Sequence, residues 1–200
     1  MINISLSTIY SAPKGIRFCY NVRVHDNCMP NCCLKWSEKL KSNISWNTVF
    51  MKVQKTKQNK NVKLKWLQIR IIHRITATNV VLNNKGVTTK TQCGFCNDEK
   101  DSSEHIFWKC SCIRHFWTSL EAILKGKCET ALNVKFTQNL VLSGTEIDVK
   151  TDTVFDLVIL QAKQFTYKCK LDKCWPILYC FLQQVMSIQK KGIQKLKAQR

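Results

Sequence analysis

Apolar residues recur along the chain three or four positions apart, which is the spacing of one helix face. The clearest stripe repeats at i, i+3, i+4, i+7 and i+11 and ends before Gly126: Ile113, Phe116, Trp117, Leu120 and Leu124. Helical patterns also predict helices over residues 34–40, 46–55, 62–75 and 151–170, and a last helix from 175 onward. Short helices are expected over 79–84 and 137–142. The pattern therefore predicts a mainly α protein with one small helical domain.

Residues suited to helix ends lie at the limits of these segments. Ser45, Thr78 and Ser111 have hydroxyl oxygens that can accept hydrogen bonds from the first free N–H groups of a helix. Gly86 is placed to end the 79–84 helix in the left-handed conformation, and Pro176 suits a first helical turn. These positions support the predicted order of helices.

The segment 62–75 combines an apolar side with a basic stripe. At ~100° per residue, four apolar residues fall on one side of the helix: Leu64, Leu67, Ile71 and Ile75. A second side carries three basic residues within about 40° of one another, bordered by two ring side chains: Lys63, Arg70 and Arg74, with Trp66 and His73. A solvated charged face is the simpler interpretation. The large aromatic residue beside the stripe favours a binding surface instead.

The charge of the chain favours a polyanionic partner. Its formal net charge is +19, and no acidic residue lies between Glu38 and Asp98, where twelve lysines and arginines occur. A surface that only needs to be soluble mixes charges of both signs. The acid-free block therefore indicates contact with phosphates, of nucleic acid first and of an anionic membrane surface second. Because no run of eighteen apolar residues occurs, no membrane span is expected.

The candidate chemistry is concentrated in one motif, C-x2-C-x8-H-x4-C, formed by Cys93, Cys96, His105 and Cys110. Three thiols and an imidazole make the four-ligand set of structural zinc sites, which leave no position for a reacting water. Burial of free cysteines is the alternative, since cysteine is often buried, and a disulfide is disfavoured by the lack of a secretory signal. The domain is therefore predicted to be built around a CCHC zinc knuckle, with His115 a weaker competitor for the place of His105.

The spacing of the motif imposes two local expectations. Gly94 should allow the tight turn that directs both sulfurs of the first pair at one ion. The run 101–104 is typical of a helix start with serine caps, which puts His105 in the first turn. His105 and Cys110 are five residues apart, about 140° around an ideal helix. The helix is therefore expected to tighten or end just before Cys110.

The two ends of the chain differ from its helical part. Residues 1–33 show no period and are interpreted as an unrelated or poorly ordered leader, followed by a domain over 34–189 and a basic tail over 190–200. A second metal site at His25, Cys28 and Cys32 is conceivable, although its spacing fits no common zinc pattern. Twelve cysteines without an apolar signal segment predict a reducing intracellular compartment, the nucleus or the cytoplasm.

An ordered set of motifs resembles a known family. The set comprises the run Trp66 to Ile75, Thr78 with Asn79, Gly86, the pair Cys93 and Cys96, the run Glu104 to Cys110, and Phe116 with Trp117. In this order it resembles the zinc-binding region that follows the polymerase domain in reverse transcriptases of LINE-type (non-LTR) retrotransposons. The stretch Ala162 to Lys170 and the terminal helix are also similar to that region, so the resemblance extends from Leu34 to Gln189.

The resemblance implies zinc bound by the four motif residues and contact with template RNA or target DNA beside a polymerase. It does not imply polymerisation, because the family's catalytic Asp-Asp pair is missing and two-metal phosphoryl transfer has no ligands here. The expected protein is a non-enzymatic accessory domain of retrotransposon origin that binds Zn²⁺ and nucleic acid with little sequence preference, alone or with a reverse transcriptase domain in trans. Nucleic-acid contact is assigned to Lys63, Trp66, Arg70, His73 and Arg74.

Two other functions remain open at this point. A zinc-braced scaffold for protein interactions would use Trp108, Phe116 and Trp117 only in its core and would have no affinity of its own for nucleic acid. A small nuclease would need carboxylates, and Asp148, Asp152 and Asp156 are available. No catalytic base joins these carboxylates at a recognisable spacing, which disfavours the nuclease.

Overall fold

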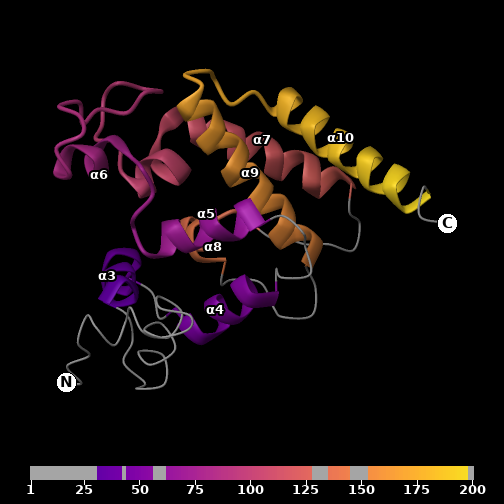
Figure 1. Cartoon of the computed structure of the whole chain (residues 1–200), viewed down its shortest axis with the longest axis horizontal. Coiled ribbons are helices and arrows are strands. Elements are labelled where there is room, and N and C mark those ends of the chain that lie inside the picture. The colour runs from indigo at the N-terminus through magenta and orange to yellow at the C-terminus, as the bar shows by residue number, and fades with distance from the viewer. Residues whose placement is uncertain (1–30, 42–43, 56–61, 128–134, 145–152, 198–200) are drawn as a thin grey trace, which may run out of the picture. The chain divides into compact units, whose positions relative to one another are not determined.

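The computed structural model of the protein describes residues 31–41, 44–55, 62–127, 135–144 and 153–197. The helices follow one another as α3 (Asn31–Leu40), α4 (Trp46–Lys55), α5 (Val62–Ile72), α6 (Asn79–Asn84), η2 (His105–Lys109), α7 (Ser111–Lys127), α8 (Gln138–Ser143), α9 (Thr153–Leu171) and α10 (Leu178–Lys197) (Figure 1). Within these ranges the only β pairing is one antiparallel bridge, between Gln92 and Lys100. The prediction of a mainly α fold is confirmed.

None of the helices in the described ranges is both long enough and apolar enough to cross a membrane.

The chain divides into two compact units, Met1–Ser42 and Asn43–Arg200. Of the first unit the structure describes α3 and Lys41. Cys33 and Trp36 of α3 are buried, whereas Leu34, expected on the apolar face, is exposed. The helices from α4 to α10 belong to the second unit. The predicted leader (1–33), domain (34–189) and tail (190–200) stay predictions.

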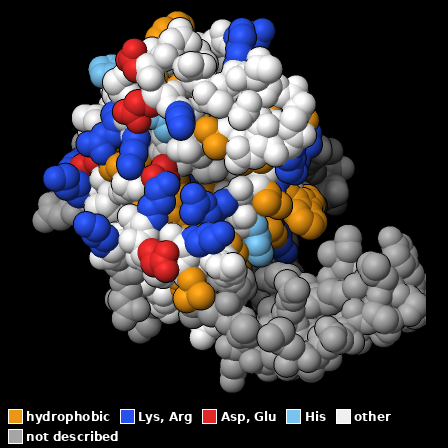
Figure 2. Space-filling view, turned by 90° about the vertical axis from the view of Figure 1, so that its left-hand side faces the viewer, with side chains coloured by type: hydrophobic (Ala, Val, Ile, Leu, Met, Phe, Trp, Pro, Cys, Tyr) orange, Lys and Arg blue, Asp and Glu red, His pale blue; other side chains and the backbone are white. Residues whose placement is uncertain are grey.

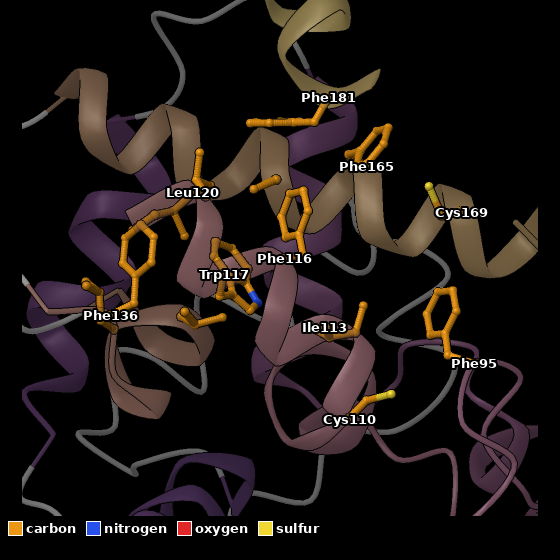
Figure 3. Close-up of a cluster of buried hydrophobic side chains, with 14 of the residues drawn as sticks. Phe95, Cys110, Ile113, Phe116, Trp117, Leu120, Phe136, Phe165, Cys169 and Phe181 are labelled. Carbon is orange, nitrogen blue, oxygen red and sulfur yellow. The ribbon is translucent and has the colours of Figure 1, made fainter. Parts of the chain in front are cut away.

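Aromatic side chains of α7, α9 and α10 form the core of the second unit. Phe116 of α7 contacts Phe165 of α9 and Phe181 of α10, with ring centroids 5.9 and 5.6 Å apart. Figure 3 shows these rings converging beside Trp117 and Leu120. The stripe predicted along this helix is confirmed: Ile113, Phe116, Trp117 and Leu120 are buried, and Leu124 is half-buried against them.

The short helix η2 joins this core to the predicted metal motif. Its residues Ile106 and Phe107 are buried, and the Phe107 ring lies 6.2 Å from that of Tyr167 on α9. The indole N–H of Trp117 donates to the Phe107 carbonyl oxygen over 2.8 Å. Contacts with α7, α8 and α9 therefore fix η2 and, with it, the position of His105.

Helix α5 ends at Ile72, earlier than the predicted Ile75. Arg74 adopts a left-handed conformation (φ 57°) and its N–H donates to the Ile71 carbonyl over 3.0 Å, while the Ile75 N–H donates to the Arg70 carbonyl over 3.0 Å. These two bonds form a Schellman motif, which stops a helix and redirects the chain. The predicted apolar face is confirmed for Leu64, Leu67 and Ile71, but Ile75 lies beyond the stop and is exposed.

The helix ends predicted for α6 are confirmed. The Thr78 hydroxyl accepts a hydrogen bond from the Val81 N–H over 3.3 Å, which caps the N-terminus. Gly86 adopts a left-handed conformation (φ 71°), and the N–H groups of Gly86 and Val87 return to the carbonyls of Asn83 and Leu82. Because glycine has no Cβ, it adopts this conformation with little strain. The chain then turns directly into the metal motif.

Candidate metal centre

The four residues of the predicted motif converge at one edge of the core. The Sγ atoms of Cys93 and Cys110 are 4.0 Å apart, Cys96 Sγ lies 3.2 Å from His105 Nε2, and all four ligand atoms lie within 4.8 Å of one another. A tetrahedral ion with ~2.3 Å bonds to sulfur holds its sulfur ligands about 3.8 Å apart. The cluster could therefore hold a metal ion. Figure 3 shows Cys110 at the margin of the core, with Phe95 nearby.

The first ligand pair lies in a loop closed by the Gln92–Lys100 bridge. Inside it, the Cys93 N–H donates to the Glu99 carbonyl over 2.8 Å and the Asn97 N–H to the Cys93 carbonyl over 3.0 Å. The left-handed residue of the turn is Asn97 (φ 59°), and a Cβ at Gly94 would meet no atom within 4 Å. The interpretation of Gly94 as the residue that permits the turn is therefore wrong. Asparagine tolerates the left-handed region and fills that role.

The second ligand pair is brought together by a π-helix. Ser102 Oγ accepts from the His105 N–H over 3.2 Å, which confirms the predicted serine cap. Over His105–Lys109 the backbone then widens, and the Cys110 N–H donates to the His105 carbonyl over 2.9 Å. A bond to the fifth preceding residue adds one residue to the turn, so residues five apart come closer to one side of the helix than they would in an α-helix. The helix does end just before Cys110, as predicted, but it widens there and does not tighten.

Cys110 caps the helix that follows it. The chain extends at Cys110 (φ −55°, ψ 130°), and the backbone N–H groups of Ile113 and Cys112 donate to its sulfur. These are the first free N–H groups of α7, which an N-cap side chain normally satisfies. The capping role predicted for Ser111 thus belongs to the Cys110 sulfur. The positive end of the helix stabilises a thiolate at this position.

One of the two buried sulfurs, that of Cys93, is poised to lose its proton. The hydrogen bond between the Cys93 and Cys110 sulfurs lowers the pKa of Cys93 against the effect of burial, and the N–H groups of Cys96 and Phe95 act in the same direction. The same bond raises the pKa of Cys110, because the two thiols share one proton. A metal ion takes the place of such a proton, and thiolates are the form of cysteine that binds metal.

Glu99 orients the histidine. Its carboxylate oxygen Oε2 lies 3.1 Å from His105 Nδ1, which leaves Nε2 directed at the Cys96 sulfur. A metal-binding histidine commonly donates its other N–H to a carboxylate, which fixes the tautomer and raises the basicity of the ligand nitrogen. The sequence reasoning missed Glu99. Its place between Cys96 and His105 is the only sequence signal that points to it.

Replacing Glu99 with glutamine is expected to weaken metal binding by roughly 10-fold, the lower end of the range for such outer partners, because the Glu99 side chain is 65% exposed. The measurement is competition for the metal against a chromophoric chelator. Asp98→Asn, which alters an exposed neighbouring carboxylate, is the matched control. Equal affinities for the two variants would show that Glu99 does not support the ligand.

A buried ion pair anchors the loop to the helices behind it. Asp101 is fully buried, and its Oδ2 accepts from the Asn79 N–H over 2.6 Å and lies 3.0 Å from Lys170 Nζ on α9. Burial raises the pKa of Asp101, which the Asn79 N–H and Lys170 oppose. Lys170 also donates to the Ala77 carbonyl over 3.1 Å. The metal loop is thus tied to both α6 and α9.

The predicted nucleic-acid residues are divided by the end of α5. Lys63 and Trp66 are exposed on the helix, and Arg70 lies one turn after Trp66 with its Nε donating to the Trp66 carbonyl over 3.4 Å. His73 and Arg74 follow the helix in the Schellman turn. The continuous basic stripe predicted through Arg74 is therefore broken after Arg70.

The remaining candidates lie apart from the cluster or outside the described residues. His115 is exposed on α7 and is not among the four residues that converge. Cys32 lies in α3 with its sulfur 4.0 Å from that of Cys33, but His25 and Cys28 lie outside the described residues. Of the nuclease carboxylates, Asp156 lies on α9, and Asp148 and Asp152 lie outside the described residues.

Comparison with models of known protein families gives no match, and comparison with curated proteins finds no similar sequence. Fold and site together define a helical protein with a Cys3His cluster that could bind a metal ion.

Proposed function

We propose that the protein is a zinc-stabilised helical module that binds RNA or DNA and does not polymerise. In this role it is similar to the zinc-binding region of LINE-type reverse transcriptases, and a reverse transcriptase domain in trans is a candidate partner. The observation that carries the proposal is the convergence of three cysteine sulfurs and one histidine nitrogen within 4.8 Å. The part of the proposal that concerns nucleic acid is supported by the basic segment around α5, which contains no acidic residue.

Zinc fits this donor set better than other common ions. Thiolates and imidazole are the ligands that zinc takes in closed, four-coordinate structural sites, whereas magnesium and calcium select oxygen ligands. Three of the four ligands are buried, and N–H groups donate to two of the sulfurs. The chain supplies all four ligands, so the ion's role is to hold the loop on the core and not to activate water.

Nucleic acid is the partner that the charge supports. Lys63 and Arg70 project from α5, within a stretch of sequence that contains no carboxylate. Figure 2 shows lysine and arginine side chains gathered on one face of the molecule, with acidic side chains among them. Basic charge is therefore widespread, and a defined site on α5 must be distinguished from attraction by net charge alone.

Reversing Arg70 and Arg74 to glutamate is expected to weaken binding of a single-stranded RNA more than reversing Lys190 and Lys191 near the C-terminus. Both double variants lower the net charge by the same amount, so the variant of Lys190 and Lys191 is the matched control for the variant of Arg70 and Arg74. Each lost phosphate contact should also reduce the slope of log affinity against log salt by about 0.7. Fluorescence anisotropy titrations of both double variants at two salt concentrations measure the affinity and the slope.

Two results would contradict the proposal in different ways. Equal losses and equal salt slopes would mean that the protein is only diffusely basic. Absence of nucleic-acid affinity in the metal-loaded wild-type protein would support the alternative, a zinc-braced scaffold for protein interactions. One observation favours that scaffold: four large apolar side chains are exposed near the turn from α9 to α10, namely Leu171, Trp175, Ile177 and Tyr179.

A further inference from the structure

Helices α5 and α9 enclose an open groove on the surface of the second unit. Its volume is about 590 Å³, and its lining comes from one strip of α5 and two residues of α9: Val62, Lys63, Trp66, Leu67 and Arg70, with Gln164 and Tyr167. Grooves of this size accommodate small organic groups. No acidic residue is part of the lining, so the groove favours an anionic occupant.

The groove has one exposed and one fixed aromatic wall. The Trp66 side chain is 56% exposed, although burying an indole against another surface is strongly favourable. Tyr167 is 9% exposed, packs against Phe107 and donates from its hydroxyl to the Ala77 carbonyl over 3.4 Å. Buried Leu67 belongs to the lining between them. A flat ring entering the groove would therefore meet an indole face that nothing else fully covers.

The two cations of the groove flank the exposed indole. Lys63 precedes Trp66 by three residues and Arg70 follows it by four, so all three side chains lie on one side of α5. Arg70 Nε donates to the backbone carbonyl of Trp66 over 3.4 Å, which holds the start of the guanidinium against the helix one turn after Trp66. Across the groove, Gln164 supplies an amide that can both donate and accept hydrogen bonds.

We propose that this groove binds one unstacked base of a single-stranded nucleic acid. Trp66 stacks on the base, Lys63 and Arg70 contact the phosphates on either side of it, and the Gln164 amide contacts the base edge. Stacking on an aromatic side chain is the common way in which proteins hold single strands, because every base has a π face. This inference rests on the proposed function. It adds that the bound nucleic acid is single-stranded and that the groove is the place where it binds.

The test uses the full-length, metal-loaded protein and two labelled single-stranded RNAs of equal length and charge, one of them with abasic positions. Trp66→Ala is expected to weaken binding of the intact RNA by roughly 10-fold, within the range measured for loss of one stacked base. Its salt slope should not change, since no phosphate contact is removed. Trp66→Phe should retain most of the affinity. Trp175→Ala is the matched control, because Trp175 is 61% exposed and does not line the groove.

The abasic RNA separates stacking from charge. The wild-type protein should bind it as weakly as Trp66→Ala binds the intact RNA, and Trp66→Ala should bind both RNAs alike. If the wild type binds both RNAs equally, or if Trp66→Ala and Trp175→Ala lose equal affinity, the groove proposal is wrong while nucleic-acid binding stands. If the wild type binds neither RNA, the proposed function itself is wrong. Circular dichroism and the metal content of each variant verify that the fold is intact.

Discussion

Substitution of Cys96 by serine is expected to release the metal and to loosen the segment Thr91–Ser111, while the aromatic core stays folded. Cys96 is one of only four ligands in the cluster. Loss of a ligand should lower metal affinity by more than the roughly 100-fold upper limit for loss of an outer partner. Metal binding supplies folding free energy to the segment that it closes. Native mass spectrometry should show one zinc ion per wild-type chain and none in the variant.

Hydrogen exchange then locates the effect. Amides of the bridged loop and of η2 should exchange much faster in Cys96→Ser, whereas those of α7 around Phe116 and Trp117 should change little. Phe116 stacks on Phe165 and Trp117 packs edge-on against Phe136, and both partner rings lie outside the segment 91–111. His105→Ala should behave in the same way. Cys174→Ser is the control, because Cys174 is an exposed cysteine outside the cluster. Unchanged exchange in Thr91–Ser111 after removal of the metal would show that zinc does not hold this segment.

The helices of the second unit could be predicted because their signals are local. Apolar spacing gives α4 with the observed limits, and the Thr78 hydroxyl and the conformational freedom of Gly86 mark the two ends of α6. The end of α5 carries no such signal. Arg74 occupies the left-handed position where glycine is usual, and an arginine gives no indication of that conformation in the sequence.

The ligand set could be predicted, but the geometry that assembles it could not. The spacing of the cysteines and the histidine identifies the four residues, and the five-residue separation of His105 and Cys110 poses a problem for an α-helix. The π-turn that solves this problem depends on η2 packing against three other helices. The α9 side of the groove depends on tertiary packing too, because Gln164 and Tyr167 are far from Trp66 in sequence.

Lys163 is the largest departure from what the sequence pattern indicates. It follows Ala162 on the apolar side of α9 and is 1% exposed, although a lysine next to an apolar stripe usually reaches water. Its Nζ donates to Gln68 Oε1 on α5 over 2.7 Å, and Gln68 Nε2 donates to the Leu142 carbonyl on α8 over 3.0 Å. Neither partner carries a charge. Burial lowers the pKa of Lys163 to about 7, and Asp156 on the same helix opposes this.

The stability of the protein is therefore expected to rise with pH between about 7 and 10.5 through Lys163. In this window the unfolded chain holds the lysine proton, because the ordinary pKa is 10.5, while the folded protein has lost it. The unfolded state then binds more protons, so the free energy of unfolding increases with pH, by up to about 1.4 kcal/mol per pH unit. Below about pH 7 both states are protonated and this contribution becomes constant.

Urea unfolding of the wild type and of Lys163→Met across this pH range measures the effect as a difference, which cancels the titration of the cysteines and tyrosines. The wild type should gain several kcal/mol relative to Lys163→Met between pH 7 and pH 10. Methionine keeps an unbranched side chain in the core and cannot take up a proton. Lys168→Met changes an exposed lysine of the same helix and should leave the pH profile unaltered. If the free energy of unfolding depends on pH in the same way in Lys163→Met and Lys168→Met, Lys163 keeps its proton in the folded protein. A buried ammonium group would then donate the hydrogen bond to Gln68.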